Sequence, residues 1–122
     1  MKQDTEIEPT GKTQRLPSPV RAALAELVTA LQRVYSDRLY RTVLYGSLAR
    51  GTGRIPDSDV DVLVVLDEEI SPVEECWRVS DVTAAISLKY DLCLAPLFMS
   101  RARYERGGSP LLLNVHREGV VL

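Results

Sequence analysis

The sequence predicts an α/β protein, in the mixed α+β sense, with a small mixed β-sheet and helices mainly on one face. Stretches with apolar residues at helical spacing alternate with short apolar runs rich in β-branched residues. The 122 residues are enough for one hydrophobic core and too few for two. No internal repeat or linker divides the chain, so we expect three core strands and a terminal one to form a single sheet.

Helices and strands are expected to follow one another closely. Residues 1–17 begin polar and without a hydrophobic period, which predicts a flexible N-terminal segment, and residues 18–122 are expected to form the domain. The expected helices cover residues 19–37, 47–50, 71–90 and 110–117, and the expected strands cover residues 39–45, 59–66, 91–98 and 120–122.

The three longer helices each begin at a Ser-Pro pair. The serines Ser18, Ser71 and Ser109 are typical helix caps, and a proline fits the first helical turn. Glu74 follows Ser71 by three residues, which is the pattern of a capping box. In the helix over 71–90, an apolar residue recurs every three or four positions, so we expect a stripe that faces the core.

The strands differ in where they should lie in the sheet. Residues 59–66 are almost all apolar after their first positions, so this strand is expected inside the sheet. Pro96 interrupts the strand over 91–98, and proline has no N–H to donate, so an edge position or the strand's end is expected there.

The composition narrows the class of protein. A net charge of −2 argues against a broad grip on nucleic acid. No apolar run has the length of a membrane span, and the first residues lack the apolar stretch of a signal peptide, so we expect a cytoplasmic protein. Cys76 and Cys93 are expected to be small core residues with reduced thiols, Trp77 is a core or an interface residue, and His116 alone builds no metal site.

Two carboxylates open the strand over 59–66. Side chains alternate along a strand, so Asp59 and Asp61 share a face, with Cα atoms about 6.6 Å apart. A turn residue and an exposed strand residue would explain either aspartate alone, but not both on one face of a buried strand. Because like charges side by side repel, a divalent cation with oxygen ligands is expected between them.

A turn with a hydroxyl group follows the strand over 39–45. Gly46 and Ser47 would offer free backbone N–H groups and a hydroxyl to a phosphate, although a Gly-Ser pair alone usually marks a turn. Carboxylates that bind a metal, together with a phosphate cradle, are the parts of phosphoryl or nucleotidyl transfer.

These residues also resemble a known family. The series Gly46-Ser47, Arg50-Gly51 and Ser58-Asp59-x-Asp61 is similar to the minimal nucleotidyltransferases, relatives of the DNA polymerase β-like transferases. The resemblance runs from about residue 18 to residue 122 and implies the nucleotidyltransferase fold. Eleven residues separate Ser47 from Asp59, one more than in many small members, and a loop absorbs such a difference easily.

The resemblance implies roles for further residues. A third carboxylate would complete a two-metal Mg²⁺ site, and Asp91 before the apolar run Leu-Cys-Leu is the candidate; the alternative is a turn residue at a helix end. Asp57 would share the face of Asp59 and Asp61 if the strand began early, but Pro56 before it favours a loop position. The family pattern places Arg50 near the phosphates, although spacing alone favours a surface charge. Gly46, Ser47 and Arg50 would bind the nucleotide, with ATP as the default.

The chain offers little surface of its own to hold an acceptor, so another molecule is expected to supply it. The resemblance implies a toxin–antitoxin pair of the type VII kind, in which the antitoxin adenylylates a tyrosine of a HEPN-domain toxin and forms a hetero-oligomer with it. One alternative is an antitoxin that neutralises its partner by binding alone. Another is nucleotidyl transfer to a small molecule or an RNA end.

Overall fold

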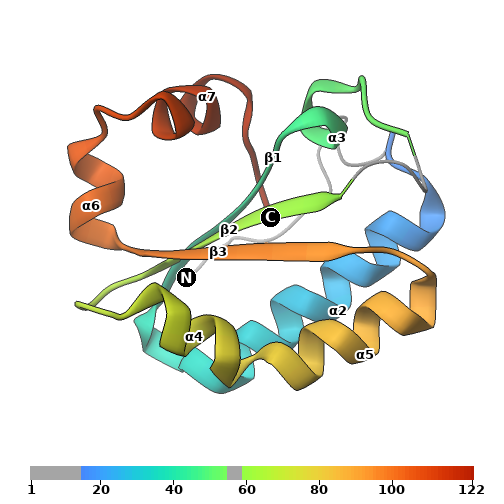
Figure 1. Cartoon of the computed structure of the whole chain (residues 1–122), viewed down its shortest axis with the longest axis horizontal. Coiled ribbons are helices and arrows are strands. Elements are labelled where there is room, and N and C mark those ends of the chain that lie inside the picture. Colours follow the sequence, from blue (N-terminus) through green and yellow to red (C-terminus); the bar gives the residue numbers. More distant parts are fainter. Residues whose placement is uncertain (1–14, 55–58) are drawn as a thin grey trace.

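The computed structural model of the chain describes residues 15–54 and 59–122 (Figure 1), so most of the N-terminal segment expected over 1–17 lies outside the described residues. Its helices are α2 (Ser18–Tyr35), α3 (Ser47–Arg50), α4 (Pro72–Arg78), α5 (Ser80–Tyr90), α6 (Arg101–Arg106) and α7 (Pro110–Glu118), with a 3₁₀ turn η1 (Ser36–Arg38). Its strands are β1 (Leu39–Tyr45), β2 (Val60–Leu66), β3 (Leu94–Ser100) and β4 (Val120–Val121). In the described part of the chain, no helix is long and apolar enough to cross a membrane.

The strands form one mixed four-stranded sheet in the order β3-β2-β1-β4. Strand β1 pairs antiparallel with β2 and with β4, whereas β2 and β3 run parallel. The predicted mixed sheet is therefore confirmed, with β2 inside it. Strand β3 lies at an edge, which is one of the two positions that Pro96 predicted, and prolines within sheets are largely confined to edge strands.

Helices cover both faces of the sheet, unequally. The longest helix, α2, packs with α4 and α5 on the face to which the buried Val60, Val62 and Val64 point, and Figure 1 shows these three helices below the sheet. The opposite face carries Leu63 and Val65, which pack with the shorter helices α6 and α7. The larger helices therefore lie on one face, as predicted, and α6 and α7 form a second, smaller layer on the other.

The helix expected over 71–90 divides into α4 and α5. Val79 is buried, and its backbone leaves the helical region at φ −104° and ψ 9°. The Ser80 hydroxyl donates to the Trp77 carbonyl at 2.8 Å. This bond satisfies a carbonyl that would accept from a backbone N–H in a continuous helix. The outer face of α4 is turned to solvent, so Trp77 is 74% exposed.

Three details of the sequence prediction were wrong. Cys76 and Cys93 are exposed: the Cys76 thiol of α4 lies 4.0 Å from the Pro96 carbonyl of the edge strand β3, and Cys93 precedes β3. The Ser71 side chain makes no capping hydrogen bond, and Pro17 rather than Ser18 stands at the N-cap of α2. The Ser109 prediction is confirmed, since its hydroxyl accepts from the Leu112 N–H at 3.1 Å.

A buried hydrogen bond joins α2 to α4. The Tyr35 hydroxyl donates to Glu75 Oε1 at 2.8 Å, and Arg78 Nε donates to the same oxygen at 2.9 Å. Burial alone raises the pKa of Glu75, but the hydrogen bonds from Tyr35 and Arg78 outweigh it and lower the pKa. A carboxyl group whose pKa is lowered by folding stabilises the fold at pH values above the ordinary glutamate pKa. This contribution is lost as the pH falls through the pKa that Glu75 has in the folded protein.

We expect Tyr35→Phe to lower the free energy of unfolding by about 1–3 kcal/mol at neutral pH, because a buried carboxylate loses a donor. The loss should shrink in acid, where Glu75 is protonated in both proteins. Denaturant unfolding at both pH values measures it, with Tyr40→Phe, a tyrosine stacked on Arg101, as the matched control. A difference as large in acid as at neutral pH would contradict this account of the bond.

Candidate active site

The structure places Asp59 and Asp61 at the start of the central strand β2. Val60 and Val62 are fully buried on the opposite face, so the two aspartates share the face that carries α6 and α7. Asp61 is half-buried and lies between Tyr45 of β1 and Ala95 of β3 in the strand register. Asp59 is exposed just before the strand. The alternation predicted from the sequence is thus present in the structure.

The two carboxylates interact electrostatically. Burial raises the pKa of Asp61, the negative charge of Asp59 raises it further, and the nearby Arg50 lowers it. Tyr45 also feels the charge of Asp61: burial raises the pKa of the Tyr45 hydroxyl, and the negative charge of Asp61 raises it further. Asp61 is therefore a carboxylate whose charge is incompletely compensated, which is the situation that a bound cation relieves.

The turn after β1 passes directly against Asp61. Gly46 has φ +83°, and a Cβ at this position would lie 3.2 Å from Asp61 Cγ and closer still to Oδ2. Only glycine combines this backbone conformation with such a close approach. The predicted turn and the predicted carboxylate, which lie on different strands, are therefore neighbours.

Ser47 opens the single turn of α3, and the following loop folds back over it. The Ser47 carbonyl accepts from the N–H groups of Thr52 and Gly53 at 2.9 and 3.0 Å. A Cβ at Gly53 would lie 2.6 Å from Ser47 Oγ, so this glycine leaves room around the hydroxyl. Sequence reasoning did not single out Gly53; the signal was the second glycine in Gly-Thr-Gly after α3.

Arg50 ends α3 and carries positive charge to the site. Its Nη1 forms an ion pair with Glu118 Oε2 at 3.3 Å, and its charge lowers the pKa of Asp61. Sequence reasoning assigned no role in the site to Glu118, at the end of α7.

Asp91 does not stand on a strand. It caps the C-terminal end of α5 in the left-handed conformation, with φ 55° and ψ 51°, and its side chain is exposed. This is the helix-end position that the sequence left open as the alternative. Strand β3 begins three residues later, at Leu94. The role of Asp91 in the site therefore remains a hypothesis, and Asp57 and Ser58 lie outside the described residues.

A cysteine stands beside Asp59 where β3 approaches the site. The Cys93 carbonyl accepts from the Val60 N–H at 2.8 Å, which places Cys93 level with Asp59. Burial raises the pKa of the Cys93 thiol, and the charge and hydrogen bond of Asp59 raise it further. The residues level with the two aspartates are therefore Cys93, just before β3, and Ala95 of β3.

The donor set fits one magnesium ion held by two carboxylates. Magnesium commonly takes one or two protein carboxylates and fills its other positions with water and substrate phosphates, which matches Asp59 and Asp61 beside the glycine turn. Over residues 15–54 and 59–122, no group of three His, Cys, Asp or Glu side chains could hold a metal. The second metal expected from the sequence, which Asp91 would help to hold, therefore stays a prediction.

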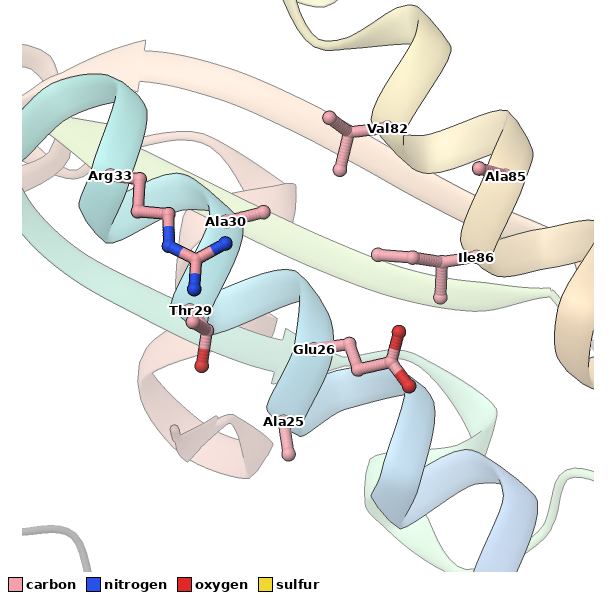
Figure 2. A pocket seen from close by; sticks show the side chains of 8 residues that line it. All are labelled: Ala25, Glu26, Thr29, Ala30, Arg33, Val82, Ala85 and Ile86. Carbon is pink, nitrogen blue, oxygen red and sulfur yellow. The ribbon is translucent and has the colours of Figure 1, made fainter.

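A groove of about 510 Å³ lies elsewhere, between α2 and α5. Figure 2 shows Val82 and Ile86 of α5 pointing toward α2, and Glu26 of α2 extending toward α5, where its Oε2 accepts from Lys89 Nζ at 2.8 Å. These helices cover the sheet face opposite to Asp61, so this groove is no part of the carboxylate site.

The structure thus combines a mixed sheet, two aspartates at the start of a central strand, and a glycine turn against one of them. The model of the nucleotidyltransferase domain matches residues 24–99, more than half of the chain. The chain therefore belongs to the nucleotidyltransferase family, and the class of enzyme predicted from the sequence is confirmed.

Two relatives come from Methanocaldococcus jannaschii. "Putative protein adenylyltransferase MJ0141" is 31% identical over 78 residues, which cover 64% of this chain and 77% of the relative. "Putative protein adenylyltransferase MJ0604" is 30% identical over 84 residues, which cover 69% and 77%.

Two solved structures share the fold. Both are crystal structures of mutant forms of the toxin–antitoxin pair MntA–HpeT, and both superpose with a TM-score of 0.52. The first is 20% identical and covers 80% of this chain and 70% of that one; the second is 18% identical and covers 78% and 68%. The predicted nucleotidyltransferase fold is thus confirmed.

Proposed function

We propose that this protein transfers AMP from ATP to a hydroxyl group on another protein, with a tyrosine of a HEPN-domain toxin as the acceptor. The observation that carries the proposal is the contact between the Gly46 turn and Asp61, with Asp59 on the same face. Two relatives named as protein adenylyltransferases support a protein acceptor, and two toxin–antitoxin structures of the same fold support a toxin partner.

Each residue of the site has a task in this reaction. Asp59 and Asp61 would hold Mg²⁺, which neutralises phosphate charge when it is bound. Ser47 would donate its hydroxyl hydrogen to a phosphate oxygen, and Arg50 would face the phosphates with its guanidinium group. The acceptor oxygen forms a bond to the α-phosphorus of ATP, the bond to pyrophosphate breaks, and the hydroxyl proton is released. Positioning and charge neutralisation account for the catalysis, without a covalent enzyme intermediate.

The test is a transfer assay with the purified HEPN-domain partner of this chain. In the presence of Mg²⁺, ATP labelled at the α-phosphorus should place label on the partner, whereas ATP labelled at the γ-phosphorus should not. Mass spectrometry of the partner should find AMP on a tyrosine. An unlabelled partner after incubation with α-labelled ATP would overturn the proposal, and γ-label on it would indicate phosphoryl transfer instead.

A second candidate is an antitoxin that acts by binding alone. It is favoured by the residues level with the aspartates, which are Cys93 before β3 and Ala95 of β3 rather than a third carboxylate. The double variant Asp59→Ala, Asp61→Ala separates the two functions. If the double variant still neutralises the toxin, binding suffices; if neutralisation is lost while the complex still forms, the chemistry is required.

A further inference from the structure

The end of α7 is held firmly beside the site, although it lies far from the site in the sequence. The Gly119 N–H donates to the Val115 carbonyl at 2.8 Å and closes the helix. A Cβ at Gly119 would lie 2.6 Å from Val43 Cγ1, so the chain passes close against β1. Strand β4 then pairs with Val43 and Leu44 of β1. The backbone at Glu118 is therefore anchored on the strand that leads to the Gly46 turn.

Glu118 uses this position to contact Arg50. Its Oε2 lies 3.3 Å from Arg50 Nη1, and the two residues are 68 positions apart in the sequence. Arg50 is itself fixed by its N–H, which donates to the Gly46 carbonyl at 3.1 Å and closes the α3 turn. The guanidinium group is thus paired with Glu118, while the backbone of Arg50 is bonded to Gly46, the residue that lies against Asp61.

A positively charged arginine near Asp61 would compete with a metal cation for the same carboxylate. An arginine near a carboxylate tends to form a bidentate ion pair with it, and an Asp61 paired in this way would be unavailable to a metal. Among the ion pairs of the described residues, that of Arg50 is with Glu118 and not with Asp61. The Glu118 carboxylate therefore pairs with Arg50 in place of Asp61.

We propose that Glu118 is a positioning residue of the site. It holds the Arg50 guanidinium beside the Gly46 turn and away from an ion pair with Asp61, so that Asp61 remains open to a divalent cation and Arg50 to the nucleotide phosphates. The inference rests on the proposed function, because it assigns Glu118 to the binding of a metal-bound nucleotide. It also makes the C-terminal helix a part of the site.

If the ion pair had a purely structural role, Glu118→Gln would act on binding only by weakening the fold. Both side chains are partly exposed, at 43% for Arg50 and 26% for Glu118, and such surface pairs add little to stability. Glu118→Gln should therefore leave the thermal unfolding midpoint nearly unchanged. Any large loss in nucleotide binding would then reflect the position of Arg50 rather than the fold.

The experiment titrates a non-hydrolysable ATP analogue into the full chain by calorimetry over a series of Mg²⁺ concentrations. We expect Glu118→Gln to weaken analogue binding at low Mg²⁺ about tenfold. Without Glu118, the Arg50 guanidinium would pair with Asp61 and lose its charge-assisted contact with the nucleotide phosphates. High Mg²⁺ should recover most of the affinity. Glu105→Gln is the matched control, because it removes an exposed glutamate paired with Arg101 at 3.0 Å on α6.

A double-mutant cycle shows whether Glu118 acts through Arg50. In an Arg50→Gln background, Glu118→Gln should have no further effect on the Mg²⁺ dependence, because there is no guanidinium group to redirect. Equal Mg²⁺ dependence for wild type and Glu118→Gln would overturn this inference alone, and so would a full effect in the Arg50→Gln background. A wild-type chain that binds no analogue at any Mg²⁺ concentration would overturn the proposed function and this inference with it.

Discussion

Asp61→Asn should abolish nucleotidyl transfer while leaving the protein at least as stable as the wild type. The amide keeps the shape of the side chain but loses the charge that holds a cation. Removal of a group that stabilises the transition state electrostatically commonly reduces the rate by about 10³-fold, and we expect at least this loss. The transfer assay with α-labelled ATP measures it directly.

The stability of this variant follows from the pKa of Asp61. Burial, and then the charge of Asp59, raise that pKa in the folded protein, so the ionised form is disfavoured by folding. A raised carboxyl pKa means that the folded state binds more protons than the unfolded state between the two pKa values. The resulting cost is present at neutral pH and fades as the pH falls through the folded pKa. Asparagine removes the cost, so the unfolding midpoint of the variant should match or exceed that of wild type near neutral pH, and the gain should vanish in acid.

Asp67→Asn is the matched control, because Asp67 is exposed beyond the other end of β2 and pairs with Arg101 at 3.5 Å. It should keep full activity. Mg²⁺ with ATP should raise the unfolding midpoint of wild type and of Asp67→Asn, since a ligand that binds only the folded state stabilises it, but not that of Asp61→Asn. Activity of Asp61→Asn above a tenth of wild type would remove this carboxylate from the mechanism.

Gly46→Ala is expected to damage both the site and the fold. The backbone at this position has φ +83°, where any side chain is strained, and the added Cβ would push on the Asp61 carboxylate. Strain of this kind costs about 1–3 kcal/mol in the free energy of unfolding. Displacement of a ligand by even a fraction of an ångström should reduce transfer about 10²-fold, because catalysis here depends on positioning.

Gly51→Ala separates the two effects of this change. Gly51 also has a positive φ, +85°, but a Cβ there would meet nothing within 4 Å. It should therefore lose about 1 kcal/mol of stability from backbone strain and keep most of its activity. Denaturant unfolding and the transfer assay on both variants make the comparison. Equal activity in the two variants would mean that the close approach of Gly46 to Asp61 does not matter to the reaction.

Much of the site could be predicted from local pattern. Alternation along a strand has a period of two, so Asp59 and Asp61 had to share a face once Val60 and Val62 were buried. A glycine after the strand over 39–45 predicted the turn, and the turn is present at Gly46. These features depend on residues within a few positions of one another, which is why the sequence alone was sufficient.

Asp91 shows where such reasoning ends. Its place before an apolar run predicted a strand residue, but α5 runs to Tyr90 and needs a left-handed residue to close it. The parallel register of β2 and β3 then puts Ala95 beside Asp61. That register is determined by packing across the whole sheet, and a shift of two residues would bring a different side chain to the same place.

The sequence by itself determined the number of strands, the glycine turn, the shared face of the two aspartates and the family to which the chain belongs. Only the tertiary structure decided that Gly46 lies against Asp61, that Cys93 stands beside Asp59, and that Glu118 reaches Arg50. The physical reason is distance along the chain. Strand periodicity and turn chemistry act over a few residues, whereas contacts between β1, β2, β3 and α7 exist only after the sheet has chosen its order and register.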